Sequence, residues 1–319
     1  MPPPSRARQA AVWTAERLAA GLGQLCGQRW KEGFGILCYH RVAEVVPGVE
    51  PPTWNVTPGQ LRAQLSGLLA CGFEPWPLAK LIRHRHLGRA IPANAFVVTF
   101  DDGYENNYTA ALPVLKELRV PATIFLATAY LDSHEPFPFD DWSATGTSRV
   151  PARSWHPLST AQCHELLASG IIELAAHTHR HERFVGRCDD FARDLDECLE
   201  TLATRFGIRQ PAFAFPYGAS SPELNAAARQ AGVRCILSTK LERVQPEQDE
   251  FQWGRFTVVA SDNAAVLAAK LSGWYTTVAT AGKRVMRRLS AAKSAAAADA
   301  PAGNTHAVQH DPLAASRAH

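Results

Sequence analysis

The sequence predicts an α/β fold with parallel strands, and three observations support this. Short apolar runs alternate along the chain with segments that have the caps and spacing of helices. The residues with the most distinctive chemistry follow directly after apolar runs. Because (β/α) barrels keep their functional residues at the carboxyl ends of their strands, this placement favours a barrel with a single catalytic domain.

The expected elements begin with a strand and then alternate. Thr57 is the expected cap of the first helix after it, and Ser159 with Gln162 forms a capping box before a later one. Pro113 counts against the helix in which it lies, because proline lacks an N–H group. Strands are expected over residues 36–40, 96–100, 122–126, 171–176, 212–215, 233–238 and 256–259. Helices are expected over residues 57–70, 108–118, 159–169, 191–206, 221–230 and 263–271.

The composition is that of a protein able to bury a hydrophobic core, because 46% of the 319 residues are hydrophobic and 20% are charged. The formal net charge of +3 is small, and basic residues without acids gather only over 283–293, so nucleic-acid binding by the main body is not expected. The seven cysteines are scattered and lack C-x-x-C spacing. This pattern indicates reduced thiols and favours the cytoplasm.

The most informative segment is the apolar run 96–100, which ends in Asp101, Asp102 and Gly103. Neighbouring residues of a strand point to opposite faces, so two adjacent carboxylates serve one site only if the strand ends there and the chain turns. Gly103 permits such a turn. One carboxylate can then bind a metal while the other moves a proton. The alternative is a plain turn in which aspartate acts as a cap.

A second apolar run, 171–176, leads into three histidines at alternate positions. Imidazole is a common ligand of zinc-like metals, and two imidazoles with one carboxylate leave a coordination position open for catalysis. The spacing leaves the ligand pair undecided. His177 and His179 share a face on a strand, whereas His177 and His181 share one on a helical turn. A solvated histidine-rich loop is the alternative.

Two further segments add weaker signals. Residues 211–218 form a short apolar run stopped by proline and glycine, where backbone N–H groups can face a developing oxyanion. Residues 132–157 are long enough for a functional loop over a site. Its aromatic residues are expected either to stack on sugar rings or to pack on one another: Phe137, Phe139, Trp142 and Trp155.

These segments, in this order, resemble the polysaccharide deacetylases of carbohydrate esterase family 4, and most closely the subgroup that de-N-acetylates poly-N-acetylglucosamine exopolysaccharides. The resemblance covers about residues 35–274. It rests on Thr99-Phe100-Asp101-Asp102-Gly103, on His177-Thr178-His179-Arg180-His181, on Phe213-Ala214-Phe215-Pro216-Tyr217-Gly218 and on the N-terminal Tyr39-His40-Arg41-Val42. It implies a distorted barrel of seven (β/α) units.

The resemblance also implies a metal-dependent removal of N-acetyl groups from an N-acetylglucosamine-containing glycan. Asp102, His177 and His181 are then the metal ligands, for zinc or alternatively cobalt or nickel. The metal polarises the acetyl carbonyl and activates a water molecule, and Asp101 is the general base. The backbone N–H of Tyr217 helps to hold the oxyanion, and Thr178 orients a ligand or the substrate.

The sequence also departs from the family pattern. Ala214 stands where the family has an arginine that orients the base, although the exopolysaccharide subgroup also lacks it. No histidine lies between Gly218 and His306, so the late histidine that serves as general acid is missing. His40 is our candidate proton donor and His179 a weaker one. Arg255 is expected either to pair with Asp101 or to be an ordinary strand-edge arginine.

The departures leave two alternatives to a glycan N-deacetylase. One is a deacylase of a non-sugar amide or imide on the same fold, and the other is a non-catalytic glycan-binding relative. The aromatic loop favours a sugar substrate, and the intact set of Asp101, Asp102, His177 and His181 favours catalysis.

The ends of the chain are expected to lie outside the catalytic domain of residues 35–280. Residues 1–34 are expected to form a helical extension without a signal peptide, and 281–319 a basic segment with a disordered, alanine-rich tail. Trp13, Leu18 and Leu22, with Leu25, can share one face of a helix that either packs on the domain or touches a membrane surface. No transmembrane span is expected. The expected location is therefore the cytoplasm, with the inner membrane surface as an alternative.

Overall fold

The computed structural model describes residues 6–27, 32–140, 142, 150–282 and 284. The chain forms two units, residues 1–279 and 280–319, and the sheet with its surrounding helices belongs to the first. The predicted alanine-rich tail and nearly all of the basic segment lie outside the described residues.

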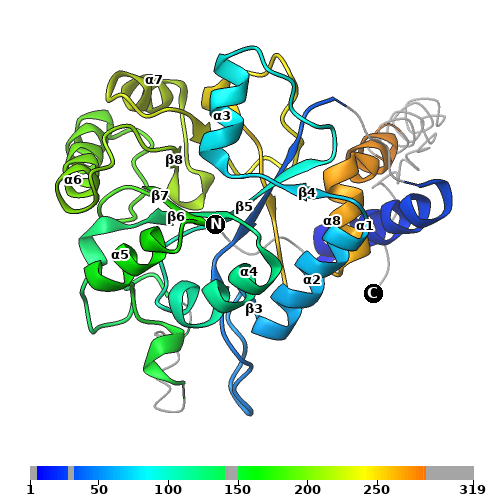
Figure 1. Ribbon diagram of the computed structural model, residues 1–319, viewed down its shortest axis with the longest axis horizontal. Coiled ribbons are helices and arrows are strands. Elements are labelled where there is room, and N and C mark those ends of the chain that lie inside the picture. The colour runs from blue at the N-terminus through cyan, green and yellow to red at the C-terminus, as the bar shows by residue number, and fades with distance from the viewer. Residues whose placement is uncertain (1–5, 28–31, 141, 143–149, 283, 285–319) are drawn as a thin grey trace, which may run out of the picture. The chain divides into compact units, whose positions relative to one another are not determined.

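Seven parallel strands of the described chain form one continuous path (Figure 1). Their order is β10 (Phe256–Thr257), β1 (Gly35–Tyr39), β5 (Ala95–Phe100), β6 (Ala122–Leu126), β7 (Ile172–Ala176), β8 (Phe213–Ala214) and β9 (Ile236–Leu237). A parallel bridge between Leu237 and Trp253 joins β9 to the segment just before β10. The sheet is therefore curled into a distorted seven-unit (β/α) barrel, and the predicted fold class is confirmed.

Short additional strands lie beside this path. β4 (Glu74–Pro75) pairs with β5, and β2 (Arg41–Val42) pairs with β3 (Asn55–Val56) in a separate two-stranded sheet. These strands were not predicted, because a pair of residues is too short to show periodicity.

The predicted helices follow the strands, and one further helix, Leu78–His86, was not predicted. The helices are α1 (Arg6–Cys26), α2 (Pro58–Ala70), α3 (Leu78–His86), α4 (Leu112–Leu118), α5 (Thr160–Ala168), α6 (Cys188–Phe206), α7 (Pro222–Gln230) and α8 (Ala264–Ser272), with short helical turns η1 (Asn107–Ala111), η2 (Thr128–Tyr130), η4 (Ala152–Ser154), η5 (Pro216–Gly218) and η6 (Glu250–Gln252). Capping boxes at Thr57 and Ser159 begin α2 and α5. Pro113 does not interrupt α4, because it lies in the first turn of the helix, where an N–H group has no helical partner. Figure 1 shows α1, α2 and α8 together at one side of the barrel and α5, α6 and α7 at the other.

Strand alternation divides the buried residues into two cores. Leu37, Val98 and Ile124 belong to the larger core beneath the helices, whereas Ile36, Val97 and their neighbours belong to a smaller core with Phe125 and Trp253. The smaller core is the barrel interior, because its strand residues alternate with those that face the helices. Residues Cys38, Thr99 and Asp101 continue the inward series toward the carboxyl ends of β1 and β5.

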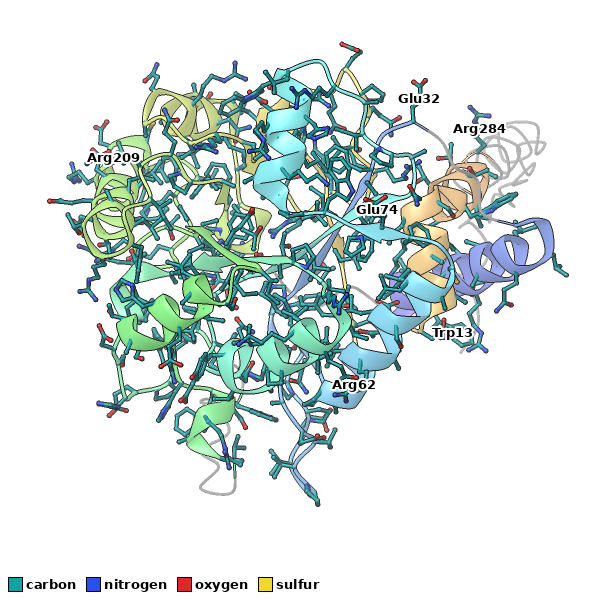
Figure 2. All side chains as sticks on the ribbon, in the orientation of Figure 1. Trp13, Glu32, Arg62, Glu74, Arg209 and Arg284 are labelled. Atoms are coloured by element: carbon teal, nitrogen blue, oxygen red, sulfur yellow. The ribbon has the colours of Figure 1, made fainter. Side chains whose placement is uncertain are left out.

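Helix α1 packs on α8 through Ala19 and Ala20, which are buried. This agrees with the expectation of a helix packed on the domain, but the packed face is not the predicted one. The apolar side chains proposed for that face are exposed, and Figure 2 shows Trp13 at the surface of the helix: Trp13, Leu18, Leu22 and Leu25. None of the described helices is long and apolar enough to cross a membrane.

Candidate metal centre

The paired aspartates lie at the carboxyl end of β5, where the chain turns sharply. Asp102 adopts the left-handed conformation, with φ 73°, and Gly103 follows with φ 84°. A Cβ atom at position 103 would meet Leu126 Cδ2 at 2.7 Å, so the turn needs glycine for space as well as for conformation. Because of this turn, Asp101 and Asp102 both face the barrel mouth, as predicted.

The histidine motif follows β7 and folds into a compact turn. Thr178 and His181 have φ values of 65° and 57°, and the Thr178 hydroxyl accepts the backbone N–H of His181 at 3.0 Å. The Asp194 carboxylate accepts the backbone N–H groups of His179 and Arg180. These bonds bring the side chains of His177 and His181 to Asp102, whereas His179 points elsewhere.

His177 and His181 approach the same carboxylate oxygen. Their Nε2 atoms lie 3.4 Å and 3.1 Å from Oδ1 of Asp102. Donor atoms at the corners of a tetrahedral zinc site with bonds of about 2.1 Å are roughly 3.4 Å apart, so these separations suit a small divalent cation. All three residues are buried.

The hydrogen bonding of His177 gives a further test of whether a cation fits here. Its Nδ1 lies 2.8 Å from the carbonyl oxygen of Ala214, which can only accept, so Nδ1 carries the hydrogen. The Nε2 atom of a neutral ring then directs a lone pair at the Asp102 carboxylate. Two acceptors in contact repel each other unless a cation or proton lies between them, and the donor set therefore fits a metal ion.

The pKa shifts of Asp102 and His177 also arise from the close approach of the carboxylates and the imidazoles. Burial acts to raise the pKa of Asp102, but hydrogen bonds with His177 and His181 lower it well below its usual value. Burial acts to lower the pKa of His177, yet the charges of Asp101 and Asp102 raise it above the ordinary value. The site thus attracts positive charge strongly.

Asp101 is held apart from this set by Arg255. The guanidinium donates two hydrogen bonds to the carboxylate, 2.6 Å from Nη1 to Oδ1 and 2.8 Å from Nη2 to Oδ2, and both side chains are buried. Burial acts to raise the pKa of Asp101, but the charge and hydrogen bonds of Arg255, together with the charges of His177 and His40, outweigh it and lower the pKa to about 2. The predicted pairing of Arg255 with Asp101 is therefore present.

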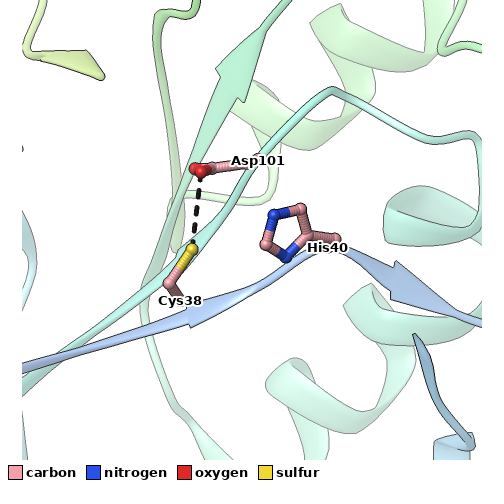
Figure 3. A group of neighbouring side chains, drawn as sticks. All are labelled: Cys38, His40 and Asp101. Carbon is pink, nitrogen blue, oxygen red and sulfur yellow. Dashed lines mark hydrogen bonds between the residues drawn. The ribbon is translucent and has the colours of Figure 1, made fainter. Parts of the chain in front are cut away.

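A second group of possible ligands lies beside Asp101, formed with Cys38 and His40 at the end of β1 (Figure 3). The Cys38 thiol lies 3.4 Å from Oδ2 of Asp101 and donates to it. Burial raises the pKa of Cys38, so the thiol stays protonated, and the Asp101 carboxylate is already occupied by Arg255. This group is therefore a poorer metal site than Asp102 with the two histidines.

His40 lies at the mouth of the barrel beside this group. Its ring stacks on Trp54 with 5.8 Å between centroids, and Trp54 is 46% exposed. The Nδ1 atom of His40 is buried and has no hydrogen-bond partner among the described residues. Burial lowers the pKa of His40 even though Asp102 and Asp101 oppose this.

The remaining predicted residues divide into two groups. Tyr217 belongs to the site, because its ring lies 4.8 Å from that of His181 and its φ of 59° turns the backbone at the end of β8. His179 does not, because its ring nitrogens face Thr128 Oγ1 at 2.9 Å and Glu197 at 3.4 Å.

In the long loop of residues 132–157, two of the aromatic residues considered for stacking on sugar rings are instead buried. Phe137 and Trp142 are buried, Phe137 against Tyr104 and Ala127 and Trp142 against Ala43, so they offer no surface to a sugar. Phe139 stacks on His181, a contact that was not predicted because nothing local marks it. The thiol contact of Cys38 was also missed, although its place two residues before His40 puts both side chains on one face of the strand.

Comparisons with known proteins identify polysaccharide deacetylases as similar to this chain. A family model described as polysaccharide deacetylase matches residues 89–236. The chain is 23% identical over 257 residues to the poly-beta-1,6-N-acetyl-D-glucosamine N-deacetylase of Staphylococcus epidermidis, which covers 75% of this chain and 83% of that protein. The protein of the same name from Escherichia coli K12 is 28% identical over 155 residues, 48% of this chain but only 22% of its own length.

Solved structures support the fold. IcaB from Ammonifex degensii superposes with a TM-score of 0.62 at 23% identity, covering 77% of this chain and 97% of that chain. The de-N-acetylase from Aggregatibacter actinomycetemcomitans gives a TM-score of 0.63 at 18% identity, covering 74% and 99%.

Proposed function

We propose that this chain, which belongs to the polysaccharide deacetylase family, is a metal-dependent hydrolase that removes N-acetyl groups from an N-acetylglucosamine-containing glycan. The observation that carries the proposal is the convergence of Asp102, His177 and His181 on one point beside a second, separately held carboxylate. The nature of the substrate is suggested by the names of the similar proteins.

Asp102, His177 and His181 would hold the metal, for which zinc is the expected ion and cobalt or nickel the alternatives. A divalent ion at such a site polarises an acyl carbonyl and makes a nearby water molecule more acidic. The Ala214 carbonyl fixes the tautomer of His177, so that its Nε2 atom is the one free to bind.

Asp101 would serve as the general base. Arg255 keeps its carboxylate ionised and fixes its orientation through two hydrogen bonds. The pKa of about 2 keeps Asp101 ionised at neutral pH, so its carboxylate is able to accept a proton from water.

The departing amine needs a proton, and His40 is the proposed donor. One of its ring nitrogens, Asp101 and Cys38 lie within 4.8 Å of one another. Burial lowers the pKa of His40, which makes its protonated form a stronger acid toward the amine. The backbone N–H of Tyr217 would donate to the oxyanion.

The test is acetate release by the purified full chain, stripped of metal and then supplied with zinc, cobalt or nickel. Chitooligosaccharides and poly-N-acetylglucosamine are the substrates. We expect acetate from at least one of them, and Asp101→Asn should abolish turnover while metal content stays near that of the native chain. Bound metal without acetate from any N-acetylated glycan would refute the proposal and favour a non-sugar amide substrate or a binding role.

A further inference from the structure

The two histidines beside Asp102 are held in different ways. His177 donates its Nδ1–H to the Ala214 carbonyl, the usual arrangement by which a metal-binding histidine is oriented. The Nδ1 atom of His181 is buried and has no hydrogen-bond partner among the residues that the structure describes. Unlike His177, His181 therefore has no hydrogen bond at Nδ1 that fixes the plane of its ring.

Aromatic rings surround His181. Phe139 lies almost parallel to it, with 3.7 Å between ring centroids and 25° between ring planes. Tyr217 meets its face edge-on at 4.8 Å, and His177 lies 5.0 Å away. Since rotation of the His181 ring would drive it into Phe139, the stacked ring restricts the direction in which Nε2 points.

Phe139 is itself held firmly by the loop that carries it. Its ring stacks on Phe137 at 4.9 Å, and Phe137 is fully buried. The next residue, Asp140, is buried in an ion pair with Arg41 and accepts a hydrogen bond from the Tyr104 hydroxyl at 2.8 Å. Arg41 directly follows His40, so the ion pair ties the wall of the metal site to the strand end that carries the proposed proton donor.

We propose that Phe139 is a positioning residue of the metal site, whose ring orients His181 in the way that the Ala214 carbonyl orients His177. The Arg41–Asp140 ion pair keeps that ring in place. This inference rests on the proposed function only in that His181 binds a divalent metal, and it does not depend on which acyl group or glycan is the substrate.

The test compares metal affinity in variants of the full chain. Phe139→Leu removes the flat ring but keeps an apolar side chain, and Phe139→Tyr keeps the ring. Zinc affinity is measured by competition with a chelator, and the visible spectrum of the cobalt-loaded protein reports the geometry of the ligands. Phe206→Leu is the matched control, because Phe206 packs edge-on against His164 at 5.2 Å and takes no part in the site.

We expect Phe139→Leu to weaken zinc binding roughly three- to tenfold, the range for the loss of one aromatic pair, and to change the cobalt spectrum. Phe139→Tyr should keep the zinc affinity and the cobalt spectrum of the native chain, and Phe206→Leu should alter neither. If Phe139→Leu does not fold, Phe139→Met replaces it with the same expectations. Folded Phe139 variants with unchanged affinity and spectrum, or equal losses in the Leu and Tyr variants, would overturn the inference.

The two proposals can fail separately. A native chain that binds zinc but releases no acetate, with weaker binding in Phe139→Leu, would end the proposed function and leave the positioning role standing. A native chain that releases acetate, with normal zinc affinity in Phe139→Leu, would support the proposed function and end the positioning role. A native chain that binds none of zinc, cobalt and nickel would refute both.

Discussion

Replacing Arg255 tests the electrostatic basis of the site most directly. Arg255→Met keeps a long apolar side chain and removes the charge that faces Asp101. Lowering the pKa of Asp101 from its ordinary 3.8 to about 2 corresponds to about 2 kcal/mol in favour of the ionised carboxylate, at about 1.4 kcal/mol for each pKa unit. Without Arg255, we expect burial, the largest single influence on this carboxyl, to raise the pKa of Asp101 above its ordinary value.

The loss of unfolding free energy in Arg255→Met should exceed this figure at neutral pH, because the variant keeps a buried carboxylate with no partner for its charge. Removing one member of a buried ion pair destabilises a protein by about 3–5 kcal/mol. Arg255→Lys should lose less, since it restores a positive charge but not the two-point contact.

The pH dependence of the unfolding free energy shows whether the Asp101 charge stabilises or destabilises each protein. In the native chain, Asp101 contributes stability that is present above pH 3.8 and is lost as pH falls toward about 2. In Arg255→Met the pKa of Asp101 in the folded state lies above that of the unfolded state, so protonation at lower pH relieves the penalty. The difference in unfolding free energy between the two proteins should therefore shrink as pH falls from about 7 to about 4.5.

The assay is urea unfolding of the metal-stripped proteins at about pH 7, 5.5 and 4.5, with kcat/KM of the metal-loaded proteins measured on an N-acetylated glycan over the same range. The acid limb of the rate profile should move to higher pH in Arg255→Met. A loss below about 1 kcal/mol, or a loss of equal size at all three pH values, would refute the reasoning, because either result would mean that Arg255 does not hold the Asp101 charge.

Three further predictions concern the proton donor, the thiols and the turn. His40→Ala should lower kcat by roughly a hundredfold or more while zinc affinity is retained, and an unchanged rate would exclude His40 as the acid. Exposed Cys71 and Cys188 should react quickly with iodoacetamide in the folded protein, whereas mass spectrometry should find buried Cys38 unmodified; fast labelling of Cys38 would contradict its raised pKa. Gly103→Ala should destabilise the protein by about 1–3 kcal/mol and weaken zinc binding, because the left-handed turn and Leu126 leave no room for a Cβ; a stable, tightly binding variant would show that the turn relaxes freely.

The sequence was a good guide where local chemistry decides the structure. Cap residues predicted the starts of α2 and α5, and the two aspartates followed by glycine predicted the turn after β5. The short strands were overestimated, since β8 and β9 contain two residues each and continue as irregular backbone. Pairing with a neighbouring strand sets such lengths, and the sequence pattern of one segment does not contain that information.

The site was predictable in its ligands but not in its surroundings. Spacing alone left His179 and His181 as alternatives, and the turn shaped by Thr178 and Asp194 is what separates them. Contacts such as Phe139 with His181 join segments far apart in the sequence, and no local signal marks them. The aromatic residues of the loop were correctly singled out, but Phe137 and Trp142 pack within the protein.

The geometry also explains how two adjacent acids avoid competing for the same partner. Strand alternation places Asp101 on the inward series with Cys38 and Thr99, where Arg255 reaches it from the start of β10. The left-handed turn at Asp102 swings the next carboxylate toward the loop after β7 and its histidines. A cation near Asp102 therefore need not displace Arg255, and Arg255 does not need to leave for the cation to bind. Two like charges one residue apart remain ionised together because the backbone turn gives each its own positive partner.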